Sequence, residues 1–294
     1  MGDNKSGSAI AEMPSGQIMN PPQRVEVVRR LIDTAFGNIG PMMDLYRPYV
    51  DGLENLARDG RFLLVGNHTQ GGGEVFLIPY FVRQEIGTRV RPLAERSMGK
   101  MPAPMSDVFA AYGAVVGAPE TARELMRHNE SILVFPGGGR EISKFKGEEY
   151  TLRWQGRAGF ARLSVENDYP IVPVALVGGD DVYRSMLTRD GRLGRFSTAI
   201  TEKLTGRTDM APPLMRGIGP TMIPRPQRMY LRFAAPIETG KPARVNHDTW
   251  VAGIKEKTQE ALEKAMAELL DIRVTDPYRE LNPLAWRYAT RPVM

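Results

Sequence analysis

Short apolar runs that alternate with helical segments are the feature of this sequence that most limits its fold. The run at 61–66 (RFLLVG), between Gly60 and Asn67, has the length and composition of a buried strand. Five further runs of this kind occur, at 90–94, 112–116, 131–135, 171–177 and 229–234. Apolar residues recur at helical spacing in 22–36, 74–86, 119–129, 159–165 and 250–270. The alternation predicts a single α/β domain with a largely parallel central sheet flanked by helices.

The strongest strand signal, 171–177 (IVPVALV), contains Pro173. Proline has no N–H to donate to a neighbouring strand. We therefore expect this strand to lie at an edge of the sheet or beside a bulge.

The 294 residues divide into a central domain and flanking segments. The first twenty residues are rich in Gly, Ser and Asn, which is typical of a flexible arm. The predicted parts are the arm at 1–20, an N-terminal helical segment at 21–58, the main domain at 59–275 with a basic-apolar insertion at 184–228, and a C-terminal tail at 276–294.

Several classes of protein are disfavoured by composition. The chain contains no cysteine, which excludes disulfides, thiolate metal sites and a cysteine nucleophile, and which fits a reducing compartment. Neither a signal peptide nor an apolar run of about 20 residues is present, so we expect a cytoplasmic protein that does not span a membrane. The opening residues 1–6 (MGDNKS) match the short pattern for N-myristoylation.

The net charge of +5 is concentrated in one segment. Residues 184–228 contain nine basic and three acidic residues, which gives this stretch +6, and apolar residues are interleaved with the charges. Such a mixture suits the surface of an anionic membrane, to which the protein would bind peripherally. The alternative is a solvated loop with a small hydrophobic cluster beneath it.

The first chemical motif is residues 67–74 (NHTQGGGE), where a predicted strand gives way to a helix. Ligands in α/β folds bind at such loops. If the three glycines turn the chain sharply, the Glu74 carboxylate can bind one ring nitrogen of His68 and leave the other free to take a proton. The alternative is a structural histidine beside a glutamate at a helix start.

The second motif is residues 135–141 (FPGGGRE), again directly after a predicted strand. Consecutive glycines let a ligand approach the backbone, and Arg140 adds a cation with forked donors. The sequence lacks the Gly-Lys-Ser or Gly-Lys-Thr ending of a Walker phosphate loop, so nucleotide hydrolysis is not expected. The alternative is a glycine-rich turn in which Arg140 pairs with Glu141 or another neighbour.

Taken together and in this order, the two motifs resemble those of the PlsC-like glycerolipid acyltransferase superfamily. The resemblance is closer to its diacylglycerol acyltransferase-like branch, which includes the phytyl ester synthases. The superfamily most often has His-x4-Asp, whereas here Gly73 stands at the aspartate position and Glu74 follows it. Its second motif is commonly Phe-Pro-Glu-Gly-Thr-Arg. Further similarity lies in 146–150, 159–162, 171–174 and 178–181, and the resemblance covers about 60–183.

The resemblance implies transfer of a fatty acyl group from acyl-CoA, or another acyl thioester, to a lipid hydroxyl. His68 would be the general base and Glu74 its partner, with acyl-CoA as a co-substrate and with neither a cofactor nor a metal. In members that use phosphate-bearing acceptors, the arginine of the second motif is associated with that phosphate. Because the Glu and Thr of the motif are replaced here, the role of Arg140 is open and an uncharged acceptor, a diacylglycerol or a long-chain alcohol, is favoured. The residues expected to contact substrate are Asn67, Gly137, Gly138, Gly139, Arg140 and Glu141.

Other functions remain as alternatives. The basic segment favours a phosphate-bearing acceptor such as lysophosphatidic acid, and a non-catalytic lipid-binding protein would share the same fold. An α/β-hydrolase would need a Gly-x-Ser-x-Gly elbow and a zinc hydrolase a His-Glu-x-x-His motif, and the sequence has neither. Nucleic-acid binding would rest on charge alone, so we expect none.

Overall fold

The structure, a computed structural model, describes residues 21–205, 211 and 213–292. The predicted arm at 1–20, with its N-myristoylation pattern, lies outside the described residues, as do the last two residues of the predicted tail. Within the described part of the chain, no helix combines the length and apolar character that crossing a bilayer requires.

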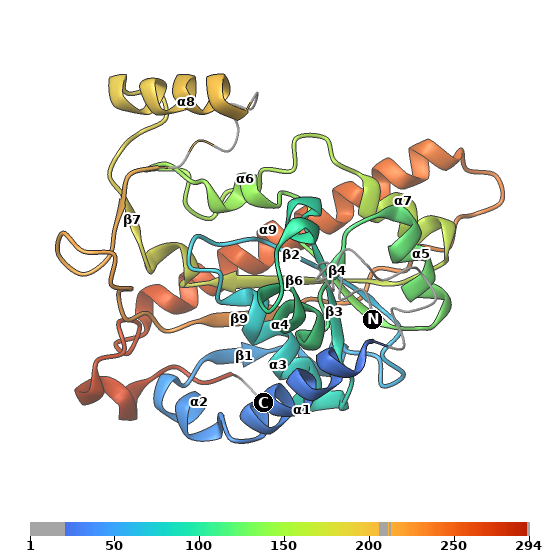
Figure 1. The fold of residues 1–294 in the computed structure, drawn as a ribbon, viewed down its shortest axis with the longest axis horizontal. Helices are drawn as coiled ribbons and strands as arrows, with labels where there is room; N and C mark the ends of the chain where they lie inside the picture. Colours follow the sequence, from blue (N-terminus) through green and yellow to red (C-terminus); the bar gives the residue numbers. More distant parts are fainter. Residues whose placement is uncertain (1–20, 206–210, 212, 293–294) are drawn as a thin grey trace, which may run out of the picture.

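The sheet formed by the described residues has seven strands in the order β1-β9-β6-β2-β5-β3-β4 (Figure 1). β2 to β6 run parallel to one another, whereas β9 pairs antiparallel with β6 and parallel with the edge strand β1. The prediction of a largely parallel central sheet is confirmed. The strands are β1 (Tyr49–Asp51), β2 (Leu63–Gly66), β3 (Val90–Ala94), β4 (Val115–Val116), β5 (Ser131–Val134), β6 (Ile171–Val177) and β9 (Tyr230–Phe233).

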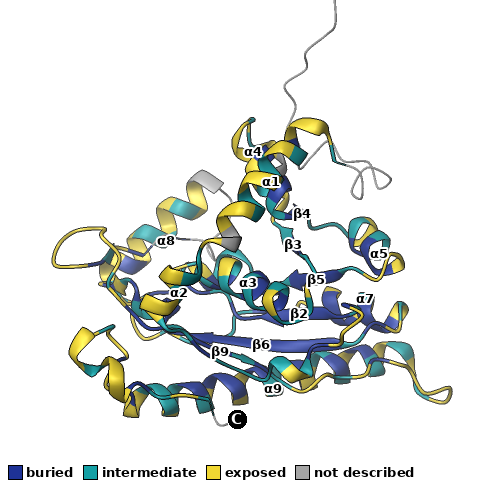
Figure 2. Ribbon diagram, turned by 90° about the horizontal axis from the view of Figure 1, so that it is seen from below, coloured by how far each residue is buried: buried dark blue, intermediate teal, exposed yellow. Residues whose placement is uncertain are grey.

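Helices cover both faces of this sheet, with α9 beneath it and α3 above it in Figure 2. Alternate strand residues point to opposite faces, so Leu63 and Val65 pack in the cluster with α5, α7 and α9, while Leu64 packs in the cluster with α3. The helices are α1 (Gln23–Gly37), α2 (Gly40–Tyr46), α3 (Glu74–Ile86), α4 (Met105–Tyr112), α5 (Pro119–Arg127), α6 (Gly139–Ile142), α7 (Gly159–Glu166), α8 (Arg192–Thr205) and α9 (His247–Thr275).

One predicted strand is largely wrong. The run at 112–116 was expected to be extended, but Tyr112 ends helix α4, and Gly113 follows with φ +112. Glycine adopts this left-handed conformation without a steric penalty and so ends the helix there. Only Val115 and Val116 pair with β3. The apolar residues just before them, Ala110 and Ala111, pack in a cluster with α1 instead.

Pro173 lies in the middle of the sheet, because β6 is flanked by β9 and β2. Between the pair Val174–Phe233 and the bridge Ile171–Ile237, β6 advances three residues and the partner segment four. A bulge therefore lies opposite Pro173, where a missing N–H is tolerated. Of the two expected positions, the bulge is confirmed and the edge is wrong.

The described residues between η4 (Gly179–Asp181) and β9, which are 182–205, 211 and 213–229, form a layer outside the sheet, beyond the carboxyl end of β6 (Figure 1). It contains the two-stranded pair β7 (Arg184–Ser185) and β8 (Met215–Arg216), with helix α8 between them in sequence. In both ribbon views α8 stands away from the strands (Figures 1 and 2). The layer as a whole includes the described part of the predicted basic-apolar insertion at 184–228.

Candidate active site

Asn67 fixes the end of β2 to the neighbouring strand. Its side-chain amide donates to the carbonyl of Leu176 (2.9 Å) and its amide oxygen accepts from the N–H of Leu176 (2.8 Å). The residue is buried. Both groups of the side chain are occupied by β6, so this geometry favours a structural role over the predicted contact with substrate.

His68 and Glu74 are in contact through Nδ1 of the ring and Oε1 of the carboxylate. Glu74 is the first residue of α3 and is fully buried, and it also accepts from the N–H (3.0 Å) and the hydroxyl (2.5 Å) of Thr69. An ionised carboxylate only accepts, so beside it a neutral His68 carries its proton on Nδ1 and presents a lone pair at Nε2. Among the described residues, Nε2 has no hydrogen-bond partner. The predicted pairing of these side chains is present in the structure.

The His68 ring is stacked on Phe135, the first residue of the second motif. The ring centroids are 4.6 Å apart and the planes are inclined by 16°. The His68 side chain is 14% exposed, so the imidazole reaches the surface from a mostly buried position. Packing on one ring face and bonding at Nδ1 together restrict the ring to one orientation.

Glu141 joins the two motifs through the main chain of His68. Its carboxylate accepts from the N–H of His68 (2.8 Å) and from the N–H of Arg153 (2.9 Å). Burial raises the pKa of the Glu141 carboxyl, although these two hydrogen bonds favour its charged form. A Cβ on Gly137 would lie 2.3 Å from the Glu141 side chain, so only glycine leaves room for it. Glu141 was expected to contact substrate, and the structure places it beneath the His68 loop.

Gly138 precedes α6, and Gly139 and Arg140 are the first two residues of that helix. The N–H of Gly138 donates to the carbonyl of Phe135 (3.0 Å) and that of Arg140 to the carbonyl of Gly137 (3.3 Å). The N–H groups of Gly138 and Arg140 are therefore both used in hydrogen bonds within the turn. The carbonyl of Arg140 accepts from the guanidinium of Arg153 (3.2 Å). The expected contacts of these residues with substrate remain predictions.

A buried ion pair between Lys144 and Asp180, which the sequence analysis did not identify, also fixes the His68 loop. Lys144 Nζ donates to the carbonyl of His68 (3.1 Å) and binds Asp180 (2.6 Å). Asp180 also accepts from the N–H groups of Gln70 (2.9 Å) and Tyr150 (2.8 Å). Both charged side chains are buried. Asp180 is the third residue after β6, in a Gly-Gly-Asp-Asp run, and this run is the one signal in the sequence that could have identified it.

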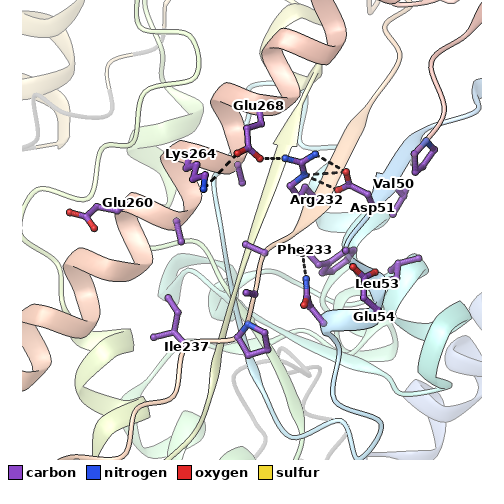
Figure 3. A pocket seen from close by; sticks show the side chains of 18 of the residues that line it. Val50, Asp51, Leu53, Glu54, Arg232, Phe233, Ile237, Glu260, Lys264 and Glu268 are labelled. Atoms are coloured by element: carbon purple, nitrogen blue, oxygen red, sulfur yellow. Dashed lines mark hydrogen bonds and ion pairs between the residues drawn. The ribbon is translucent and has the colours of Figure 1, made fainter. Parts of the chain in front are cut away.

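A cavity of about 890 Å³ lies elsewhere, between β1, β9 and α9 (Figure 3). It adjoins Phe233 and Ile237, beside the amino end of β6, whereas His68 follows the carboxyl end of β2. Arg232 in its wall binds Asp51 (2.8 Å) and Glu268. The cavity is therefore at the opposite end of the sheet from His68, and its central cation is already paired.

Comparison with known proteins identifies a family and two plant relatives that this chain resembles. Residues 47–177 match the family model described as Acyltransferase. The chain is 30% identical over 258 residues to phytyl ester synthases 2 and 1 of Arabidopsis thaliana, which covers 80% and 79% of this chain. It spans about a third of the length of these relatives, at 36% and 35%.

Among solved structures, the chain is similar to the 1-acyl-sn-glycerophosphate acyltransferase PlsC of Thermotoga maritima. The TM-score is 0.45 at 15% identity, over 85% of this chain and 86% of that one. The family match and the two plant relatives agree with the fold and with the order of the motifs. Residues 47–177 thus match the Acyltransferase family, and the resemblance to the glycerolipid acyltransferases is confirmed.

Proposed function

We propose that this enzyme transfers a fatty acyl group from an acyl thioester such as acyl-CoA to the hydroxyl of an uncharged lipid, a diacylglycerol or a long-chain alcohol. The observation that carries the proposal is the contact of His68 Nδ1 with the buried Glu74 carboxylate, because it leaves Nε2 as an acceptor at the surface of the site. The phytyl ester synthases are also named for the formation of an ester.

In the proposed reaction His68 Nε2 removes the proton from the acceptor hydroxyl while that oxygen attacks the thioester carbonyl. Glu74 stabilises the imidazolium that forms, as the carboxylate of a catalytic triad does. The tetrahedral intermediate then expels the thiolate of coenzyme A, which takes the proton from His68. The acyl group is thereby bonded to the acceptor oxygen, and no covalent acyl-enzyme is needed.

The surroundings of His68 support this role because they fix the loop without using Nε2. Glu141 binds the N–H of His68, and Lys144 binds its carbonyl. A base that is fixed in its reactive position lowers the entropic part of the barrier to the attack, because it does not have to be oriented in the transition state. Glu141 and Lys144 are therefore positioning residues in this proposal.

Helix α8 supports a peripheral position on an anionic membrane. Its apolar residues Leu193, Phe196 and Ile200 are 63%, 64% and 43% exposed. Its small polar residues, among them Thr198 and Thr201, are half-buried, so the usual arrangement of an amphipathic helix is reversed. Basic side chains at 192, 195 and 203 lie on the same exposed helix. A lipid surface with anionic headgroups satisfies both the apolar stripe and the charges.

The test of the substrate assignment is release of coenzyme A by the full chain with long-chain acyl-CoA and a panel of acceptors. We expect release with diacylglycerol or a long-chain alcohol to exceed release with lysophosphatidic acid. The reverse order would assign a phosphate-bearing acceptor, the second candidate, which the surplus of basic residues in 184–228 favours. Tight acyl-chain binding without release under any of these conditions would contradict the proposal and indicate a lipid-binding protein.

A further inference from the structure

Three arginines line a second cavity, of about 290 Å³, in the layer outside the sheet. In sequence, this layer comes between β6 and β9. Arg184 comes from β7, Arg216 from β8 and Arg225 from the chain that returns toward β9. Glu280 is the acidic residue among the described residues that line it. The cavity wall therefore carries an excess of positive charge, and it is distinct from the contacts that hold His68.

The pairing of β7 with β8 brings two of these cations face to face. Arg184 and Arg216 are direct partners in the antiparallel register, so their side chains leave the same face of the pair. Like charges in this position repel each other. Within the described residues, neither guanidinium has a hydrogen-bond or ion-pair partner. An anion between the two would convert the repulsion into attraction.

Other arginines of the same layer are already bonded to acidic side chains. Arg189 binds Glu148 (2.6 Å) and Arg228 binds Asp276 (2.5 Å). Arg225 donates to the carbonyl of Asp181 (3.2 Å), which fixes it to the chain that follows β6. Acidic side chains from outside this layer thus pair with Arg189 and Arg228, whereas the structure gives Arg184 and Arg216 no such partner among the described residues.

The cavity is mechanically connected to the His68 loop. Ser185, next to Arg184 in β7, accepts from the side-chain amide of Gln70 (2.9 Å) and donates to the carbonyl of Lys144 (2.6 Å). Gln70 lies two residues after His68, and Lys144 binds the His68 carbonyl (3.1 Å). The cavity and the candidate base therefore lie at the same end of the sheet and are held by one set of hydrogen bonds.

We propose that the cavity lined by Arg184, Arg216 and Arg225 binds a phosphate group. Guanidinium groups present paired donors that match phosphate oxygens, and a phosphate accepts from several of them at once. The group belongs either to the nucleotide end of a coenzyme A donor or to the head of a phospholipid. Exposed Ile218, Met222 and Ile223 on the adjoining loop suit both a membrane surface and an acyl chain. The link of this cavity to acyl transfer rests on the proposed function, but phosphate binding itself does not.

The test compares Arg216→Gln and Arg184→Gln with Arg244→Gln in the full chain. Arg244 is exposed and precedes α9, so its substitution removes the same charge outside the cavity. Equilibrium binding is measured for coenzyme A and for a water-soluble short-chain phosphatidic acid. Pantetheine and a short-chain diacylglycerol serve as their phosphate-free counterparts. Loss of one charged hydrogen-bond donor should raise the dissociation constant for a phosphate-bearing probe about tenfold.

If only the affinity for coenzyme A falls, the cavity is a subsite for the acyl donor. If only the affinity for phosphatidic acid falls, it is a site for a lipid headgroup. If both affinities fall, the site takes phosphate from either source. Binding of both phosphate probes that matches Arg244→Gln would overturn the proposal. Because two like charges face each other, either single substitution should leave the melting temperature unchanged or raise it. Phosphate binding should also persist in His68→Ala, so failure of the catalytic assignment and failure of this one are distinguishable.

Discussion

The Glu141 carboxylate accepts a hydrogen bond from the main-chain N–H of His68 at 2.8 Å, across 73 positions of sequence. The two glycine-containing motifs therefore meet at the main chain as well as through the stacked rings of His68 and Phe135. This contact makes the position of the candidate base depend on a residue that does not touch the base's ring.

Glu141→Gln should lower the free energy of unfolding by about 1–3 kcal/mol, because an amide has one oxygen for two buried N–H donors. It should also change the pH dependence. Burial raises the pKa of Glu141, so the native state holds this proton more tightly than the unfolded chain does. Stability from this group is present below about pH 4.3 and is lost as the pH rises through the raised pKa.

Urea unfolding of the two proteins across this pH range measures the effect. The wild-type free energy of unfolding, relative to that of Glu141→Gln, should fall as the pH rises. A difference that stays constant with pH would show that Glu141 titrates as it does in the unfolded chain.

Glu74→Gln should reduce turnover by about 10²- to 10⁴-fold, because a glutamine amide can donate to Nδ1 and so place the ring proton on Nε2. That tautomer cannot take the acceptor proton. Release of coenzyme A under saturating substrate gives the value, and circular dichroism checks the fold. A variant with wild-type turnover would show that Glu74 does not set the state of His68.

Lys144→Met should destabilise the protein by about 3–5 kcal/mol, because it leaves the Asp180 carboxylate buried without its cation. The double variant with Asp180→Asn should lose less than the sum of the two single variants. Arg127→Gln breaks the exposed pair with Glu124 and is the control, with a much smaller expected loss because solvent screens this pair. Denaturant unfolding of the wild type, the two single variants and the double variant gives the cycle, and Arg127→Gln is measured beside it. Equal losses for Lys144→Met and Arg127→Gln would mean that the buried pair does not hold the loop.

Replacing Leu193, Phe196 and Ile200 of α8 together by Ser should weaken binding to anionic vesicles by at least about tenfold, because each apolar side chain contributes on insertion. The matched control is Leu284→Ser, since Leu284 is 89% exposed outside this helix. Cosedimentation with vesicles of phosphatidylcholine, with and without phosphatidylserine, measures the change. Unchanged binding of the triple variant would show that α8 is a solvated surface helix that does not contact the membrane.

The sequence predicted the central sheet well, because its strands are short apolar runs bounded by turns. It predicted poorly where local pattern and tertiary contact compete. Tyr112 was expected to begin a strand but ends the helix Met105–Tyr112, whose Ala110 and Ala111 pack against Val25 of α1. The edge strand Tyr49–Asp51 exists only through its pairing with Tyr230–Arg232, which no local pattern reveals.

At the candidate site, the contact of His68 with Glu74 was predictable because only five residues separate them, and three of these are glycines that permit a sharp turn. The roles of Glu141 and Lys144 were not, since each binds the main chain of His68 from more than 70 positions away. A buried lysine is recognised only when its partner Asp180 is seen beside it. The same holds for Arg184 and Arg216, which are 32 residues apart and meet only in the β7–β8 pair.

The most direct test of the central claim is the rate of coenzyme A release by His68→Ala with acyl-CoA and the best acceptor of the panel. We predict a loss of at least ~10²-fold in turnover, with a melting temperature close to that of the wild type. A folded variant that keeps the wild-type rate would contradict the assignment of His68 as the base.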